Sequence, residues 1–142
     1  MGTKVSGYNI LFKMNSKTIL GVTQDELQVS AQTKDSITKD DAGTKNTEVT
    51  GHEVTFTASG LIEVKATGET SKVDANDLLE QSLKKGSAAI VPFVYDRGTG
   101  LDNYSGNCIM TDYSESSPAD PDSDTTWSAS FKVSGDMSKV TQ

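Results

Sequence analysis

The residues of this chain that could support acid–base or nucleophilic chemistry are few and far apart. His52 is the only histidine, and it stands far in sequence from any obvious nucleophile. A catalytic nucleophile needs a base within hydrogen-bond reach, so a surface or hydrogen-bonded role is the expectation for His52. Cys108 is the only cysteine, and apolar residues follow it in a predicted strand. We therefore interpret Cys108 as a small core residue rather than a reactive thiol.

The acidic clusters also lack the pattern of a dedicated site. Residues 120–124, DPDSD, are similar to the first half of a calcium-binding loop, but the sixth position is Thr125 and the twelfth is Phe131. Such loops use glycine and glutamate at these two positions. Asp40 and Asp41 could pair as in a glycosidase, but no aromatic platform lies near them in the sequence. The chain does not read as an enzyme, and we expect no cofactor or metal.

Charge and composition exclude further classes. The formal net charge is −7, and Arg97 is the only arginine, which argues against tight binding of nucleic acid. A surface past which DNA only moves must not hold the phosphates, so a weakly repulsive, acidic surface suits it. The hydrophobic share is 34%, which a sheet with one wet face tolerates and a helical bundle does not. A lone cysteine forms no internal disulfide, so we expect folding in a reducing cytoplasm. No apolar run is long enough to span a membrane, so we expect no membrane insertion.

Two long alternating segments must supply much of the core. Residues 50–65, TGHEVTFTASGLIEVK, place apolar side chains on even positions and mostly polar ones on odd positions. Residues 127–137 repeat this alternation. Side chains alternate between the two faces of a strand, so both segments are predicted to be strands with one buried and one wet face. Phe56 and Phe131 are expected in the core.

Shorter strands and one long loop complete the predicted sheet. Strands are predicted at 7–14, 18–22, 25–32, 88–95 and 104–113, with a hairpin turn at 15–17. The run at 88–95 is continuously apolar, so burial on both faces or at a subunit contact is expected, and Pro92 suggests an edge or a bulge. The 17 residues of 33–49 are almost wholly polar. Little burial can offset their ordering entropy, so a mobile loop is predicted, with a solvated spacer as the alternative.

One helix is predicted at 74–85. Asp74 can cap its first turn, and Asp77 follows three residues later. Leu79 and Leu83 lie one turn apart with Leu78 beside them, and this stripe is expected to pack on an edge or face of the sheet. Gly86 is expected to end the helix in a left-handed conformation.

This order of elements resembles the major tail tube proteins of long-tailed bacteriophages, which are related to the tube protein of type VI secretion. The matching segments are the loop at 34–41 (KDSITKDD), the strand at 54–62 (VTFTASGLI), the helix at 74–85, the strand at 104–111 (YSGNCIMT) and the closing strand at 127–135 (WSASFKVSG). The resemblance spans nearly the whole chain. The DPDSD segment and Cys108 have no counterpart in it.

The resemblance implies one mainly β domain over 1–142, an antiparallel β-sandwich or barrel with one flanking α-helix and a long charged loop. Such subunits stack as rings, usually six-fold, into a hollow tube through which DNA or an effector passes. The implied partners are further copies of the chain, a tail-tip initiator, a tail terminator and, if the tail is contractile, a sheath. The implied location is the virion tail, assembled in the bacterial cytoplasm, and DNA passes without specific binding.

Two sets of site residues follow from that interpretation. The loop at 33–49 is the expected inter-ring assembly loop, with the charged residues Lys34, Asp35, Lys39, Asp40 and Asp41. Glu53 and Glu63, on the polar face of the central strand, are the candidates for the lumen. Two other classes stay open. A β-sandwich module that binds carbohydrate or a cell surface would need exposed aromatic residues in one patch, and a small hydrolase is disfavoured by the lone histidine.

Overall fold

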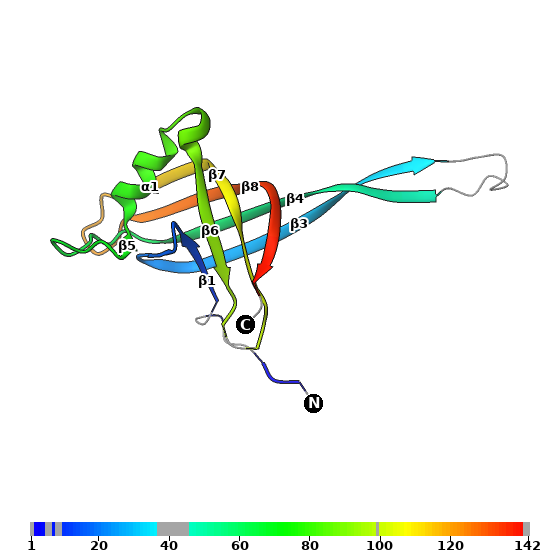
Figure 1. Cartoon of the computed structure of the whole chain (residues 1–142). Coiled ribbons are helices and arrows are strands. Elements are labelled where there is room, and N and C mark those ends of the chain that lie inside the picture. Colours follow the sequence, from blue (N-terminus) through cyan, green and yellow to red (C-terminus); the bar gives the residue numbers. More distant parts are fainter. Residues whose placement is uncertain (1, 5–6, 8–9, 37–45, 99, 141–142) are drawn as a thin grey trace.

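The computed structural model describes residues 2–4, 7, 10–36, 46–98 and 100–140. Its elements, in chain order, are β1 (Leu11–Met14), β2 (Lys17–Ile19), β3 (Val22–Ser36), β4 (Asn46–Leu61), β5 (Lys72–Val73), α1 (Ala75–Ser82), the 3₁₀ helix η3 (Gly86–Ala89), β6 (Ile90–Asp96), β7 (Asn103–Ser116) and β8 (Thr126–Val140). In the described part of the chain, the strands form one sheet in the order β3-β4-β8-β7-β6-β1-β2-β5 (Figure 1). Neighbouring strands are antiparallel except β2 and β5, which are parallel. The mainly β prediction is confirmed.

Four long strands lie side by side at one end of this order. β3, β4, β8 and β7 have 15, 16, 15 and 14 residues, and we call them the wall. The two alternating segments of the sequence pair directly in it, with Phe56 opposite Phe131. Both phenylalanines are buried, so the predicted strand faces are confirmed.

The central strand ends earlier than predicted. β4 stops at Leu61, whose N–H donates to the carbonyl of Gly21 at 2.9 Å. A Cβ on Gly60 would lie 1.9 Å from the Gly21 oxygen, so this close approach of two backbones requires glycine. Glu63 therefore lies beyond the strand, and its predicted place on the polar face of the strand is wrong.

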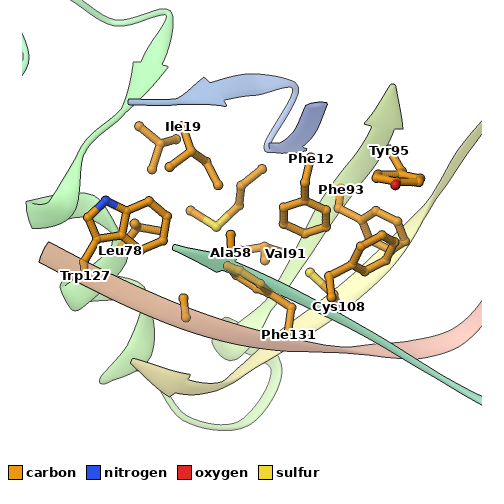
Figure 2. Close-up of a cluster of buried hydrophobic side chains, with 14 residues drawn as sticks. Phe12, Ile19, Ala58, Leu78, Val91, Phe93, Tyr95, Cys108, Trp127 and Phe131 are labelled. Carbon is orange, nitrogen blue, oxygen red and sulfur yellow. The ribbon is translucent and has the colours of Figure 1, made fainter. Parts of the chain in front are cut away.

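The sheet curls so that its other strands cover the wall. β2 leads into β3 through Leu20 and Gly21, although the two strands are far apart in the sheet order. β1 thereby crosses the wall, and the ring centroid of Phe12 lies 4.7 Å from that of Phe56 and 4.8 Å from that of Phe131 (Figure 2). The core lies between these layers. Curling lets one sheet bury a whole face against itself.

The first hairpin has the predicted turn but shorter strands. Asn15 and Ser16 both have positive φ, 54° and 60°, as a two-residue hairpin turn requires. β1 begins only at Leu11, and residues 8 and 9 of the predicted strand lie outside the described part of the chain. β2 ends at Ile19, and Val22 already belongs to β3.

The helix is capped as predicted but packs through only one residue of the predicted stripe. The Asp74 side chain accepts from the Asp77 N–H and the Asp77 side chain from the Asp74 N–H, a complete capping box. Of the predicted stripe, Leu78 is buried, whereas Leu79 and Leu83 are exposed, so the prediction is wrong for these two. Gln81 is the other buried residue of the helix. The helix also ends at Ser82. Gly86 has the predicted positive φ, 62°, but it begins η3.

The apolar segment 88–95 is buried on one face only. Within β6, Val91, Phe93 and Tyr95 point into the core, while Ile90 and Pro92 are exposed, so the prediction of burial on both faces is wrong. β6 is also an interior strand, between β7 and β1. Pro92 fits there because the pairing with β1 ends at Phe93, and the Pro92 carbonyl accepts from the Asn15 N–H at 2.9 Å.

Candidate assembly surfaces

The wall presents a polar face away from the core. Directly paired residues share a face, so the register defines three rows across the strands. The rows are Gln28–Thr55–Lys132–Ile109, Glu26–Thr57–Ser130–Asp112 and Gln24–Ser59–Ser128–Ser114, and Ile109 is their one apolar residue. We call these residues the polar face. On the opposite side of the same strands, Phe56, Ala58, Ala129 and Phe131 are buried.

The polar face is hollowed at the end away from the β3–β4 hairpin. A hollow of about 580 Å³ is lined by the ends of the four wall strands: Thr23, Ser59, Gly60, Leu61, Ser114, Glu115, Ser116, Thr126, Trp127 and Ser128. Most of these side chains carry hydroxyl groups, and the hydroxyl oxygens of Ser114 and Ser128 lie 2.9 Å apart. A surface of this kind offers hydrogen bonds and little charge.

The polar face carries more acidic than basic side chains. Glu53 extends this face toward the hairpin, and its carboxylate lies 3.5 Å from the Lys132 ammonium. Glu26 and Asp112 are the other acidic side chains, and Lys132 is the only basic one in the three rows. The face is therefore mildly acidic, and Glu53 lies beside it as predicted from the alternation. Lys132 also lies on the polar side of its strand, as the alternation of 127–137 predicts.

A two-stranded arm extends from the wall. β4 pairs with β8 only from Thr55 onward, whereas its pairing with β3 continues to Ser36 and Asn46. We call residues 29–36 and 46–54 the arm, and Figure 1 shows it projecting from the body. The predicted loop at 33–49 is thus too long, because 33–36 and 46–49 are paired strand residues. Backbone pairing replaces the side-chain burial that the polar composition lacks.

The charged loop residues fall into two groups. Lys34 and Asp35 lie on β3, exposed, opposite Glu48 and Thr47. The Thr47 hydroxyl donates to the Asp35 carboxylate at 2.8 Å, which ties the two strands near the end of the described arm. The remaining candidates, Lys39, Asp40 and Asp41, lie outside the described residues.

One side of the arm carries four apolar residues, together with His52 opposite Ala31 and Thr33 opposite Val49. Thr50 forms a bulge opposite Gln32 and donates from its hydroxyl to the Gln32 carbonyl at 3.2 Å. The extra residue keeps Val49 on the same side of the ribbon as Val54. Val54 is two residues from the core residue Phe56, so it lies on the core side of β4. Val29 and Ala31 lie on this side of β3. We call Val29, Ala31, Val49 and Val54 the arm stripe. Alternation in the predicted strands already puts Val29 and Ala31 on one face and Val54 on the apolar side, but the place of Val49 was not predictable because the bulge interrupts the alternation.

The candidate catalytic residues that lie in the described part of the chain form no site, and Asp40 and Asp41 lie outside it. His52 is exposed on the arm. Cys108 is fully buried, and burial raises the pKa of its thiol to about 12, so it is protonated and inert at neutral pH. The Asp120 carboxylate accepts from the Asp122 N–H at 3.0 Å, as in an ordinary turn. Within the described residues, no group of three or more His, Cys, Asp or Glu is placed to hold a metal.

Two further features bear on the other classes. Among the described aromatic residues, Phe12, Phe56, Phe93, Tyr95, Trp127 and Phe131 are buried and Tyr104 and Tyr113 are half-buried. No aromatic platform for a sugar is therefore exposed in this part of the chain. No helix in the described ranges has the length and apolar character needed to span a membrane.

Known structures decide the fold. The chain superimposes on a chain from the tail of an empty gene transfer agent particle, solved with C6 symmetry, with a TM-score of 0.76 and 14% identity over 97% of this chain and 100% of that one. It also matches the SPP1 tail tube, with a TM-score of 0.65 and 11% identity over 96% of this chain and 78% of that one. This chain has the tail tube fold. The resemblance drawn from the order of elements is thereby confirmed at the level of fold.

The tail tube fold also matches a chain of an extracellular contractile injection system, the PVC sheath–tube complex in its extended state. The TM-score is 0.68, with 12% identity over 99% of this chain and 95% of that one. No protein-family model matches the sequence, and no curated protein is similar to it. Composition, patterning and backbone geometry therefore carry the relationship, since few residues are shared.

Proposed function

We propose that this chain is the structural subunit of a phage tail tube, or of a tube of a phage-tail-like particle, and that its copies stack as rings into a hollow conduit for DNA or an effector. The observation that carries the proposal is the wall: four strands of 14 to 16 residues with one face in the core and the other mainly polar, with Leu61 and Ile109 as exceptions. A wall of this kind suits the lining of a water-filled channel.

Ring formation explains the free edge of the wall. Among the described strands, β3 is the last of the sheet and pairs only with β4, so the other edge of this 15-residue strand has no strand partner there. Long open edges invite pairing with other chains. In a closed ring each copy covers the edge of its neighbour, and ring symmetry limits the association. The gene transfer agent tail, with C6 symmetry, suggests six copies.

The polar face is proposed to line the lumen. Its only lysine in the three rows, Lys132, lies beside Glu53, so DNA would meet little positive charge. Affinity for phosphate backbones comes from released counterions, and a lining without free cations gives almost none. Glu53 is the better of the two lumen candidates, because Glu63 lies beyond the end of β4.

The arm is proposed to carry the inter-ring assembly loop, with Lys34, Asp35, Lys39, Asp40 and Asp41. We expect this loop to become ordered only against the next ring, so that assembly waits until a template exists. The template would be a tail-tip initiator, with a tail terminator at the other end and a sheath if the tail is contractile. Assembly would occur in the host cytoplasm, the product would be part of the virion tail, and the subunit would be neither an enzyme nor a cofactor protein.

Electron microscopy of purified protein tests the proposal. The chain should form rings or tubes at high concentration, and a tail-tip initiator should lower the concentration required. A variant in which Asn-Gly replaces residues 37–45 tests the loop, because Ser36 and Asn46 are paired and such a turn can join them. It should keep the fold and lose polymerisation. Normal tubes from this variant would show that residues 37–45 act only as a spacer.

A further inference from the structure

The wall strands β4 and β8 separate part-way along their length. They pair as far as Thr55 and Lys132. β4 then continues through residues 46–54 of the arm, whereas β8 continues through residues 133–140 beside β7. Figure 1 shows β8 turning away from β4 beyond this point. Among the described strands, residues 46–54 therefore have β3 on one side and no strand on the other.

A bulge in β8 lies just beyond the separation. Residues 135–137 of β8 stand opposite the single residue Gly106 of β7. Gly135 has a φ of 84°, in the left-handed region that favours glycine. A Cβ on Gly106 would lie 3.3 Å from the Asp136 carbonyl oxygen and 3.3 Å from the Phe93 ring, so this close approach favours glycine on β7 as well. A bulge of this kind bends its strand and increases the local twist.

The bulge bends β8 without turning its faces over. Met137, at the far end of the bulge, still packs against the core. Residues 138–140 then pair with 103–105, and the Lys139 ammonium lies 3.7 Å from the Asp102 carboxylate. The end of β8 is thus fastened to β7 and not to β4.

Without the bulge, β8 would run on beside β4. In the register of the existing pairs, Val133 would fall opposite Val54, on the core side. Ser134 would fall opposite Glu53, on the polar side. β4 would then gain backbone pairing on the side that now has no strand. The alternation of both segments permits this longer pairing, so the bulge is the feature that prevents it.

We propose that the Gly135 bulge keeps the arm a two-stranded ribbon, and that a chain without the bulge would pair β8 along the arm and fail to assemble. This inference rests on the proposed function, in which the arm carries the assembly loop. A third strand would stiffen the ribbon and cover one of its two edges, so the arm could no longer adapt to the next ring. The bulge thus fixes where the body ends and the arm begins.

Gly135→Val tests the bulge directly, because a β-branched residue strongly disfavours a positive φ. In the free subunit, the amides of 46–54 should exchange about tenfold more slowly than in the parent chain, since they gain a strand partner. Gly68→Val is the matched control, because Gly68 has a φ of 86° in a turn and a Cβ at either glycine meets nothing within 4 Å. It carries the same backbone cost and should leave 46–54 unchanged. Unchanged exchange in Gly135→Val, or an equal gain in both variants, would overturn the inference.

A disulfide should restore the bulge in this variant. Ser105 and Ser138 are opposite each other in the bulged register, whereas in a continuous one Ser105 would face Asp136. With Ser105→Cys and Ser138→Cys added to Gly135→Val, oxidation should return the exchange of 46–54 to the parent rate and restore tubes. Reduction should reverse both effects. Identical behaviour of the oxidised and reduced protein would contradict the proposed role of the bulge.

Removal of Gly135 and Asp136 eliminates the bulge without imposing an unusual backbone conformation. It joins Ser134 to Met137, so each later residue keeps its face and its partner on β7. The shortened chain should fold, show the same slow exchange at 46–54, and form no tubes where the parent chain does. If it forms tubes as readily as the parent, this inference is wrong and the proposed function stands. If the parent chain itself never assembles, the proposed function fails, and exchange in the free subunits still decides what the bulge does.

Discussion

Phe56 and Phe131 face each other on neighbouring strands and meet Phe12 from the layer above. The centroid distances of 4.7 Å and 4.8 Å are those of tilted aromatic pairs, and Phe93 adds a further ring at 5.2 Å from Phe56. Figure 2 shows Phe12, Phe93 and Phe131 converging in this cluster. With only 34% hydrophobic residues in the chain, a few aromatic side chains must supply much of the core. Each of them should therefore be costly to remove.

Replacing Phe56 or Phe131 with alanine should lower the free energy of unfolding by about 3–5 kcal/mol, through lost burial and the cavity left behind. Thr57→Ala is the matched control, because Thr57 directly follows Phe56 in the sequence and lies on the polar face. It should cost less than about 1 kcal/mol. Urea melts of the three variants measure both effects. Similar losses at Thr57 and Phe56 would show that the wall faces the other way.

The contact between Asp77 and Lys65 should make the stability of the protein depend on pH. Its carboxylate accepts from the Lys65 ammonium at 2.7 Å and from the Asp74 N–H at 3.3 Å, which ties the segment after β4 to the start of α1. The hydrogen bond from Lys65, more than any other contact, holds the pKa of Asp77 below its ordinary value of 3.8. A carboxyl whose pKa falls on folding stabilises the folded state when ionised.

The Asp77 contribution should be present above pH 3.8 and be lost as the pH falls through the lower pKa of the folded state. Asp77→Asn removes the titration, so the variant should be modestly less stable at pH 7 and should lose less on acidification. Urea midpoints of both chains at neutral pH and in acid measure the difference. The idea fails if the midpoints of the two chains fall in parallel.

At the scale of elements, the arm marks the limit of what could be predicted from local sequence. Strand alternation, the Asn15–Ser16 turn and the Asp74 capping box are local signals, and all three were predictable. The arm was not, because the residues at 33–36 and 46–49 have loop-like composition and are held by backbone pairing. The sides of α1 and β6 were also misassigned. Apolar residues such as Leu83 and Ile90 fit a core as well as a subunit contact, and only the surroundings distinguish the two.

Amide exchange should report the state of the arm. In the free subunit, residues 29–36 and 46–54 should exchange much faster than Phe56 to Leu61, because the ribbon has one neighbour per strand and little burial. In assembled tubes the same amides should become protected. Hydrogen exchange with mass spectrometry, on free and pelleted protein, measures the change. Equally strong protection in the monomer would contradict ordering on assembly.

At the scale of the whole molecule, the net charge of −7 is not concentrated on the proposed lumen. The polar face carries few charges, and Lys132 offsets Glu53 across 3.5 Å. Most of the acidic excess therefore lies elsewhere, and the proposed lining is chiefly hydroxyl and amide groups. Such a lining lets DNA pass because it offers no cation at which a phosphate would stall, with only a weak repulsive field.

Purified tubes should therefore bind DNA negligibly at moderate salt. Thr57→Lys, in the middle of the polar face, should create binding that weakens steeply with salt, since each neutralised phosphate adds about 0.9 to the slope. Val140→Lys, outside the polar face, is the control for added charge and should have a much smaller effect. Co-sedimentation with labelled duplex over a salt series measures this. Salt-resistant binding by the parent tubes would favour another role.

The orientation of the wall in an assembled tube tests the central claim most directly. Cryo-electron microscopy of tubes formed by this chain should show rings in which β3, β4, β8 and β7 surround the channel, with Thr57, Ser130 and Asp112 facing it and Phe56 in the wall. A map with the polar face on the outer surface, or a closed oligomer without a channel, would contradict the account.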